Sequence, residues 1–113
     1  MNFSIKSGDT SPSIAYVPIL QADQILTGAT VVFSAVGDNG LLTIDKQAAS
    51  IAMIDVDGEG TMEEGFKYDW KTADTLTMGL LKKGEFQVTF ADGSIETFPN
   101  VGYIDLTMTE ELA

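Results

Sequence analysis

Five carboxylates crowd into ten residues near the middle of this 113-residue chain: Asp55, Asp57, Glu59, Glu63 and Glu64. Hard divalent cations such as Ca²⁺ take several carboxylate and carbonyl oxygens, and Gly58 would let the segment wrap around one. The spacing departs from the twelve-residue calcium loop, which closes on a bidentate glutamate. Two interpretations therefore stay open: a calcium site held by Asp55, Asp57 and Glu59, or an acidic turn that meets only solvent.

A second pair of carboxylates, Asp69 and Asp74, flanks Trp70. Such pairs perform glycosidase chemistry when they face each other across a cleft. Asp69 falls on the outward phase of its expected strand and Asp74 in a turn, so nothing aims the two at one bond. Histidine, cysteine and arginine are absent from the sequence, which removes the usual general base, a thiol nucleophile and bidentate phosphate binding. We expect no enzymatic activity.

The net charge of the chain limits the classes of partner that we expect. Seventeen acids against six lysines give a net charge of −11, which repels nucleic acid and anionic lipid. The longest apolar runs fall short of the ~18 residues that a membrane span needs. The N-terminal segment lacks the apolar region of a secretory leader, so we expect the protein to be made and to mature in a cytoplasm. Nucleic acid and membrane are thus not expected partners, whereas a basic partner fits.

In the segments that must position these side chains, apolar and polar residues alternate with a period of two. Apolar residues alternate with polar ones around residues 3–5, 13–17, 29–36, 48–56, 66–70, 86–90 and 104–108. Residues 41–44 could form a short strand or a wide loop. Turn residues separate the segments, notably Gly8-Asp9-Thr10, Gly28 at a strand entry and Asp92-Gly93. This spacing predicts an all-β protein, residues 1–113 forming a single antiparallel β-sandwich of seven to eight strands.

The aromatic side chains mostly fall on inward phases and are expected in the core: Phe3, Phe33, Phe66, Tyr68, Trp70, Phe86 and Phe90. Only Tyr16 and Tyr103 are expected to be free to meet a ligand. Pro18 lacks an N–H and predicts a sheet edge or an interruption there. Lys82 and Lys83 are expected at a solvated hairpin end.

Several segments also carry a resemblance in their order and spacing: residues 5–12 (IKSGDTSP), 26–33 (LTGATVVF), 68–70 (YDW) with Asp74, Thr75 and Gly79, 84–90 (GEFQVTF) with Asp92-Gly93, and 97–100 (TFPN). With these marks the chain resembles the immunoglobulin-like domains of tailed-phage virion proteins, including the N-terminal domain of the phage baseplate upper-protein family. The resemblance runs from about Phe3 to Leu112. Leu80 to Gly84 depart from it, since the family usually has a tyrosine in that region.

The resemblance implies an immunoglobulin-like sandwich and a structural role in the virion. The expected protein is a non-enzymatic tail or baseplate accessory or adaptor, made in the bacterial host cytoplasm, that contacts other virion proteins. A homo-oligomer or a symmetric assembly of many copies is expected, because virion parts are symmetric. The alternatives are a capsid decoration or head-fibre protein, or a surface module that binds a carbohydrate or receptor. The resemblance supplies no binding residue.

Overall fold

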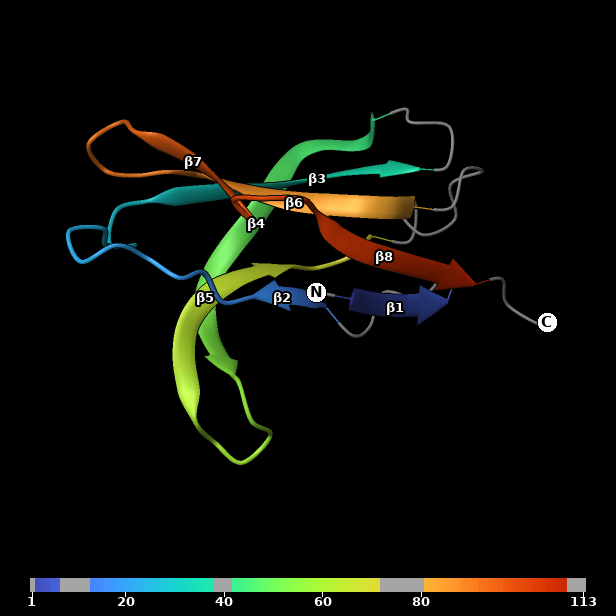
Figure 1. Ribbon diagram of the computed structural model, residues 1–113, viewed down its shortest axis with the longest axis horizontal. Helices are drawn as coiled ribbons and strands as arrows, with labels where there is room; N and C mark the ends of the chain where they lie inside the picture. Colours follow the sequence, from blue (N-terminus) through green and yellow to red (C-terminus); the bar gives the residue numbers. More distant parts are fainter. Residues whose placement is uncertain (1, 7–12, 38–41, 72–80, 110–113) are drawn as a thin grey trace.

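The protein is described by a computed structural model over residues 2–6, 13–37, 42–71 and 81–109. Every regular element in these residues is a β-strand, which confirms the all-β class (Figure 1). The described strands are β1 (Asn2–Lys6), β2 (Ile14–Tyr16), β3 (Thr30–Gly37), β4 (Leu42–Asp55), β5 (Met62–Tyr68), β6 (Leu81–Thr89), β7 (Ile95–Phe98) and β8 (Ile104–Thr109).

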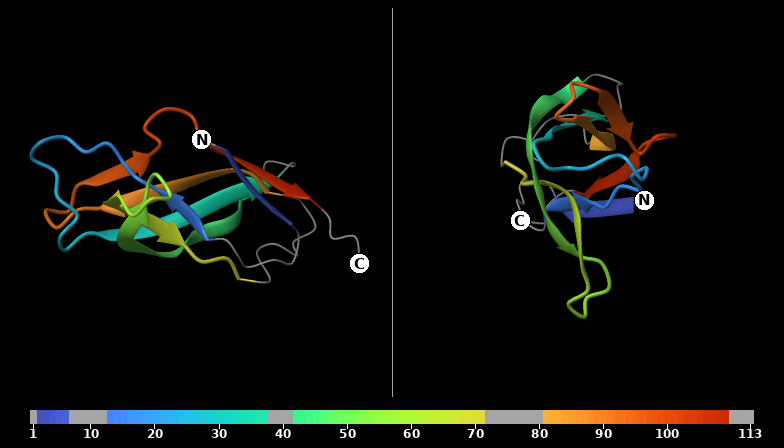
Figure 2. Two further views of the ribbon diagram at one scale, coloured as in Figure 1. Left: turned by 90° about the horizontal axis from the view of Figure 1, so that it is seen from below. Right: turned by 90° about the vertical axis from the view of Figure 1, so that its left-hand side faces the viewer.

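The strands form one sheet in the order β1-β8-β6-β3-β4-β5-β2, and β7 pairs with β6 outside this path. The described pairs are antiparallel except one, since β1 runs parallel to β8. The sheet curls until its two end strands, β1 and β2, lie on the same side of the molecule, which gives a nearly closed barrel (Figures 1 and 2). An immunoglobulin-like arrangement goes beyond these pairings and stays a prediction.

The sequence pattern did not predict that β4 is one continuous strand. Residues 41–44 and 48–56 were expected as separate segments, but β4 runs through both for 14 residues. Its register against β3 shifts near Ala35, and Lys46 takes a positive φ of 49°, so the strand passes this irregularity without ending. The first half of β4 pairs with β3 and the second half with β5, which makes β4 the strand that carries the sheet around its curve.

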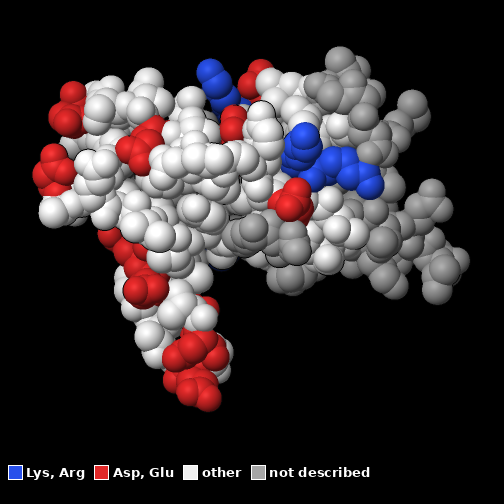
Figure 3. All heavy atoms as spheres, in the orientation of Figure 1, with Lys and Arg blue, Asp and Glu red and all other residues white. Residues whose placement is uncertain are grey.

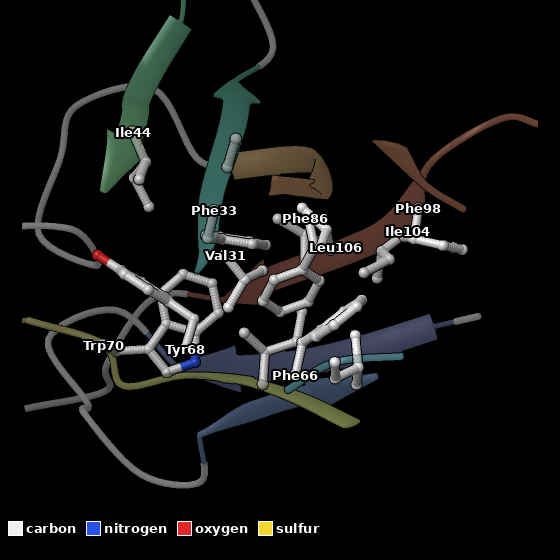
Figure 4. Packing of buried hydrophobic residues seen from close by; sticks show 14 of the residues in the cluster. Val31, Phe33, Ile44, Phe66, Tyr68, Trp70, Phe86, Phe98, Ile104 and Leu106 are labelled. Carbon is white, nitrogen blue, oxygen red and sulfur yellow. The ribbon is translucent and has the colours of Figure 1, made fainter. Parts of the chain in front are cut away.

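The core lies inside this curl and is aromatic. Of the residues expected there, Phe33, Phe66, Tyr68, Trp70, Phe86 and Phe90 are buried, and Phe3 packs against them half-buried. Phe33 lies at the centre, with its ring centroid 4.8 Å from that of Tyr68, 4.9 Å from Phe86 and 5.7 Å from Trp70 (Figure 4). Such offset and edge-to-face rings are the favoured arrangement for aromatic pairs. The remaining core members are Ile5, Ile14, Leu26, Val31, Ala35, Ile44, Val88, Phe98, Ile104 and Leu106.

The turn chemistry read from the sequence holds where the chain is described. Gly93 has a φ of +89°, and the Phe90 N–H donates to the Ser94 carbonyl at 2.8 Å, which closes the β6–β7 hairpin. Gly28 has a φ of +77° just before β3. β2 is an end strand of the sheet, as Pro18 predicted. The expected turns at residues 8–10 and 72–75 lie outside the described residues.

Candidate functional site

The feature that stands out from the body is an arm formed by the ends of β4 and β5. Met53 pairs with Glu64, Ile54 with Glu63, and Asp55 with Met62. The arm extends beyond the curled sheet (Figure 2), and acidic side chains gather at its tip (Figure 3). Residues 47–66 contain five acids and no lysine, so the charged side chains of the arm are all negative. Sequence analysis singled out its acids but not its shape.

The carboxylates of Asp55 and Asp57 organise the tip of the arm. Asp55 accepts hydrogen bonds from the Gly58 N–H at 2.9 Å and the Gly60 N–H at 3.2 Å. Asp57 accepts from the Glu59 N–H at 2.8 Å, and the side chain of Thr61 is the main cause that lowers its pKa, from 3.8 to about 2. Hydrogen bonds to the ionised form favour it, because they are lost on protonation. Both acids thus act as acceptors for the turn's own amides.

Calcium binding by Asp55, Asp57 and Glu59 stays a prediction. The structure places the three in one exposed turn, yet the described residues contain no group of three or more acids placed to hold a metal ion. Calorimetry with millimolar calcium tests the expectation: a rise in melting temperature supports a site, and an unchanged melting temperature removes it.

The second carboxylate pair is described only in part. Asp69 is exposed and accepts a hydrogen bond from the Ser13 hydroxyl at 2.5 Å, and it lies 3.5 Å from the Lys67 ammonium. The Ser13 bond is the main reason that the pKa of Asp69 is lowered. Asp69 therefore ties the start of β2 to the end of β5. Asp74 lies outside the described residues.

The two tyrosines expected to be free differ from each other. Tyr103 is exposed, and the Lys83 ammonium lies 5.3 Å from its ring centroid, within cation–π range. Tyr16 is not free, since its ring packs 6.4 Å from both Phe86 and Phe98, and burial raises its pKa. The expectation for Tyr16 was wrong because β2 folds over the core as an end strand. The hollow beside Tyr103 and Lys83 measures only about 40 Å³, too small for a sugar ring.

A larger hollow lies between the loop before β3 and the β6–β7 turn. It measures about 320 Å³ and includes Gln21, Gln24, Asp92 and Ser94 in its lining. Gln24 accepts from the Gln21 N–H at 2.9 Å and donates to Glu96 at 2.8 Å, while the Ser94 hydroxyl donates to Asp92 at 2.6 Å. These polar groups hold the two loops in place. Sequence reasoning missed this hollow because it forms between segments about 70 positions apart, as the Gln24–Glu96 pair shows.

A third hollow, of about 370 Å³, lies where β3 begins beside β4. Its lining is small and apolar, with Ala48 and Ala49 from β4 and Val31 and Val32 from β3. We call it the notch. Its signal in the sequence is the run of small residues at 48–50, which was assigned only to a strand.

The chain matches no family model, no curated protein and no solved structure. Within the described residues, no helix has the length and apolar content needed to cross a membrane. What the chain does must accordingly be argued from its own surfaces.

Proposed function

We propose that this chain is a non-enzymatic structural protein of a tailed-phage virion, an accessory or adaptor of the tail or baseplate that works through protein–protein contacts. The observation that carries the proposal is the projecting arm, where Met53, Val56 and Met62 are 56%, 46% and 47% exposed beside the acids. Exposed apolar side chains rimmed by charge are typical of protein interaction sites. The all-strand fold and the sequence resemblance point the same way.

The finer assignments belong to the same proposal. We infer an immunoglobulin-like topology for the curled sheet, and several copies of the chain in a symmetric assembly with other virion proteins. The strongly acidic surface supports contacts with basic protein surfaces and disfavours nucleic acid and membranes as partners.

A surface module that binds a carbohydrate is the second candidate, and the 320 Å³ hollow between the two loops favours it. The volume suits a small polar ligand. The Gln24 amide and the Asp92 carboxylate already bond to neighbours, however, so a sugar would have to compete with those bonds. This candidate ranks below the structural one, and silence on a glycan array would count against it.

Mass spectrometry of purified particles, separated into tails and heads, tests the proposal. Recovery with tails supports the tail or baseplate role, and recovery with heads favours capsid decoration or a head fibre instead. Absence from both fractions contradicts a virion role.

A further inference from the structure

Among the described residues, the second half of β4 has an open edge. β3 pairs with β4 only as far as Val31 opposite Ala49, whereas β4 continues to Asp55. Over residues 50–55, the described partner of β4 is β5 on its other side. A strand edge of this kind presents a row of backbone N–H and C=O groups to which an extended chain can add.

The notch lies at the start of this open edge, where β3 would continue if it were longer. Its lining includes Thr30 and Ile51 in addition to Val31, Val32, Ala48 and Ala49. Because alanines line a space of about 370 Å³, a large apolar side chain of an added strand fits there. The notch therefore gives the edge a fixed register for whatever binds.

The outer part of the edge carries methionines and acids on one face. Residues directly opposite in an antiparallel pair share a face, so Met53 and Glu64 lie together, as do Asp55 and Met62. Methionine is flexible and packs against surfaces of varied shape. The arm thus continues the apolar notch into a mixed apolar and acidic surface.

The negative charge of the arm indicates which kind of segment can bind at this edge. A second copy of the chain would bring its own five acids of residues 55–64 against those of the first, and each copy carries a net charge of −11. Like charges brought together in one interface disfavour such a pair. A segment with lysine or arginine would instead be attracted to the arm.

We propose that the open edge of β4 accepts an extended basic segment of a partner protein as an added strand, with an apolar side chain in the notch and lysine or arginine drawn to the acids of the arm, where Glu63 and Glu64 lie on opposite faces of β5. The inference deepens the proposed function and rests on its contact role. It also explains why a two-stranded arm, only marginally stable by itself, extends from the body: a third strand would complete it.

The test is an NMR titration of the isotope-labelled protein with a short blocked peptide of alternating lysine and valine. We expect shift changes concentrated in residues 30–32 and 48–55. The peptide lysines lie on one face of the added strand, so Glu63→Gln with Glu64→Gln removes the facing acid whichever face they take. One exposed charge pair is worth about 0.2–1 kcal/mol, so binding should weaken roughly 1.4- to 5-fold.

The matched control removes the same charge elsewhere, by Asp23→Asn with Asp45→Asn, both at exposed positions. It should change affinity less than about twofold, since these acids do not lie on the arm. Ala48→Trp fills the notch from an exposed position and should weaken binding at least tenfold; Thr30→Trp tests the same point if that variant does not fold.

Four outcomes would overturn the inference. Shift changes spread evenly over the acidic surface, or equal losses in the arm and control variants, would mean that binding is unspecific attraction. Equal affinity for a peptide of alternating glutamate and valine would refute the preference of the arm for a basic segment. A dimer in sedimentation that is lost on Ala48→Trp would assign the edge to a second copy. Each result is independent of particle composition, so it is distinguishable from failure of the virion proposal.

Discussion

Replacing Gly84 by alanine should destabilise the protein, although alanine is ordinarily the better residue in a strand. A Cβ at this position would lie 2.8 Å from Phe33 Cζ and 3.0 Å from Phe33 Cε1. Carbon atoms in good contact are about 3.5–4.0 Å apart, so one group must move by roughly 0.7 Å. Neither is free to move: Phe33 is fully buried among rings, and Gly84 is paired with Ala35 on β3 and Ile104 on β8.

The magnitude follows from two opposing terms. Overpacking a core costs about 1–3 kcal/mol, and the lower backbone entropy of the unfolded alanine chain returns about 0.4–1 kcal/mol. The net loss should be about 1–2 kcal/mol in the free energy of unfolding. For a chain of this size, that is a fall in melting temperature of about 4–8 °C. Urea titration followed by tryptophan fluorescence measures it.

A double-mutant cycle separates this cause from a general effect of substitution. In a Phe33→Leu background the facing side chain is smaller, so adding Gly84→Ala should cost at least about 0.5 kcal/mol less than in the wild type. An unchanged or increased stability of Gly84→Ala, or strict additivity with Phe33→Leu, would refute the close contact.

The remaining predictions concern the arm and the core. The pKa of Asp57 is lowered from 3.8 to about 2, so its ionised form stabilises the turn above pH 3.8, and this contribution is lost as the pH falls from about 4 to 2. An NMR titration of the carboxyl group measures the pKa. Thr61→Val should raise this pKa toward 3.8, and a further decrease would be incompatible with the hydrogen bonding described. Asp55→Ala removes acceptors for Gly58 and Gly60 and should speed amide exchange at both positions, with β6 unaffected as the internal control. Trp70→Phe should lower the free energy of unfolding, measured by urea titration, by no more than about 1.5 kcal/mol. The buried Nε1–H has no acceptor among the described residues, so its removal recovers about 1–3 kcal/mol of desolvation penalty that offsets the lost packing. A loss above 3 kcal/mol would argue against an unpaired N–H.

Local patterns were sufficient to predict much of the fold. Alternation around Phe33, Phe66 and Phe86 identified β3, β5 and β6 and most of the core, because inward and outward positions alternate in a strand. Asp92-Gly93 identified the β6–β7 turn for the same local reason.

What could not be predicted depends on contacts distant in the sequence. The parallel pairing of β1 with β8 joins the two ends of the chain, for which no short pattern exists. Tyr16 was assigned to the surface because its partners Phe86 and Phe98 come more than 60 residues later. The notch arises because β4 is longer than β3, and the sequence had divided β4 at its irregularity near Lys46.

Zero-length cross-linking of carboxylates to amines on intact particles, read by mass spectrometry, tests the central claim most directly. If the chain is a virion protein whose arm binds a basic segment, Glu63 and Glu64 should be linked to lysines of another virion protein, more often than the exposed Asp23. Absence of the chain from the particles would contradict the virion role. Its presence with cross-links at Asp23 but none at the arm would contradict the docking edge.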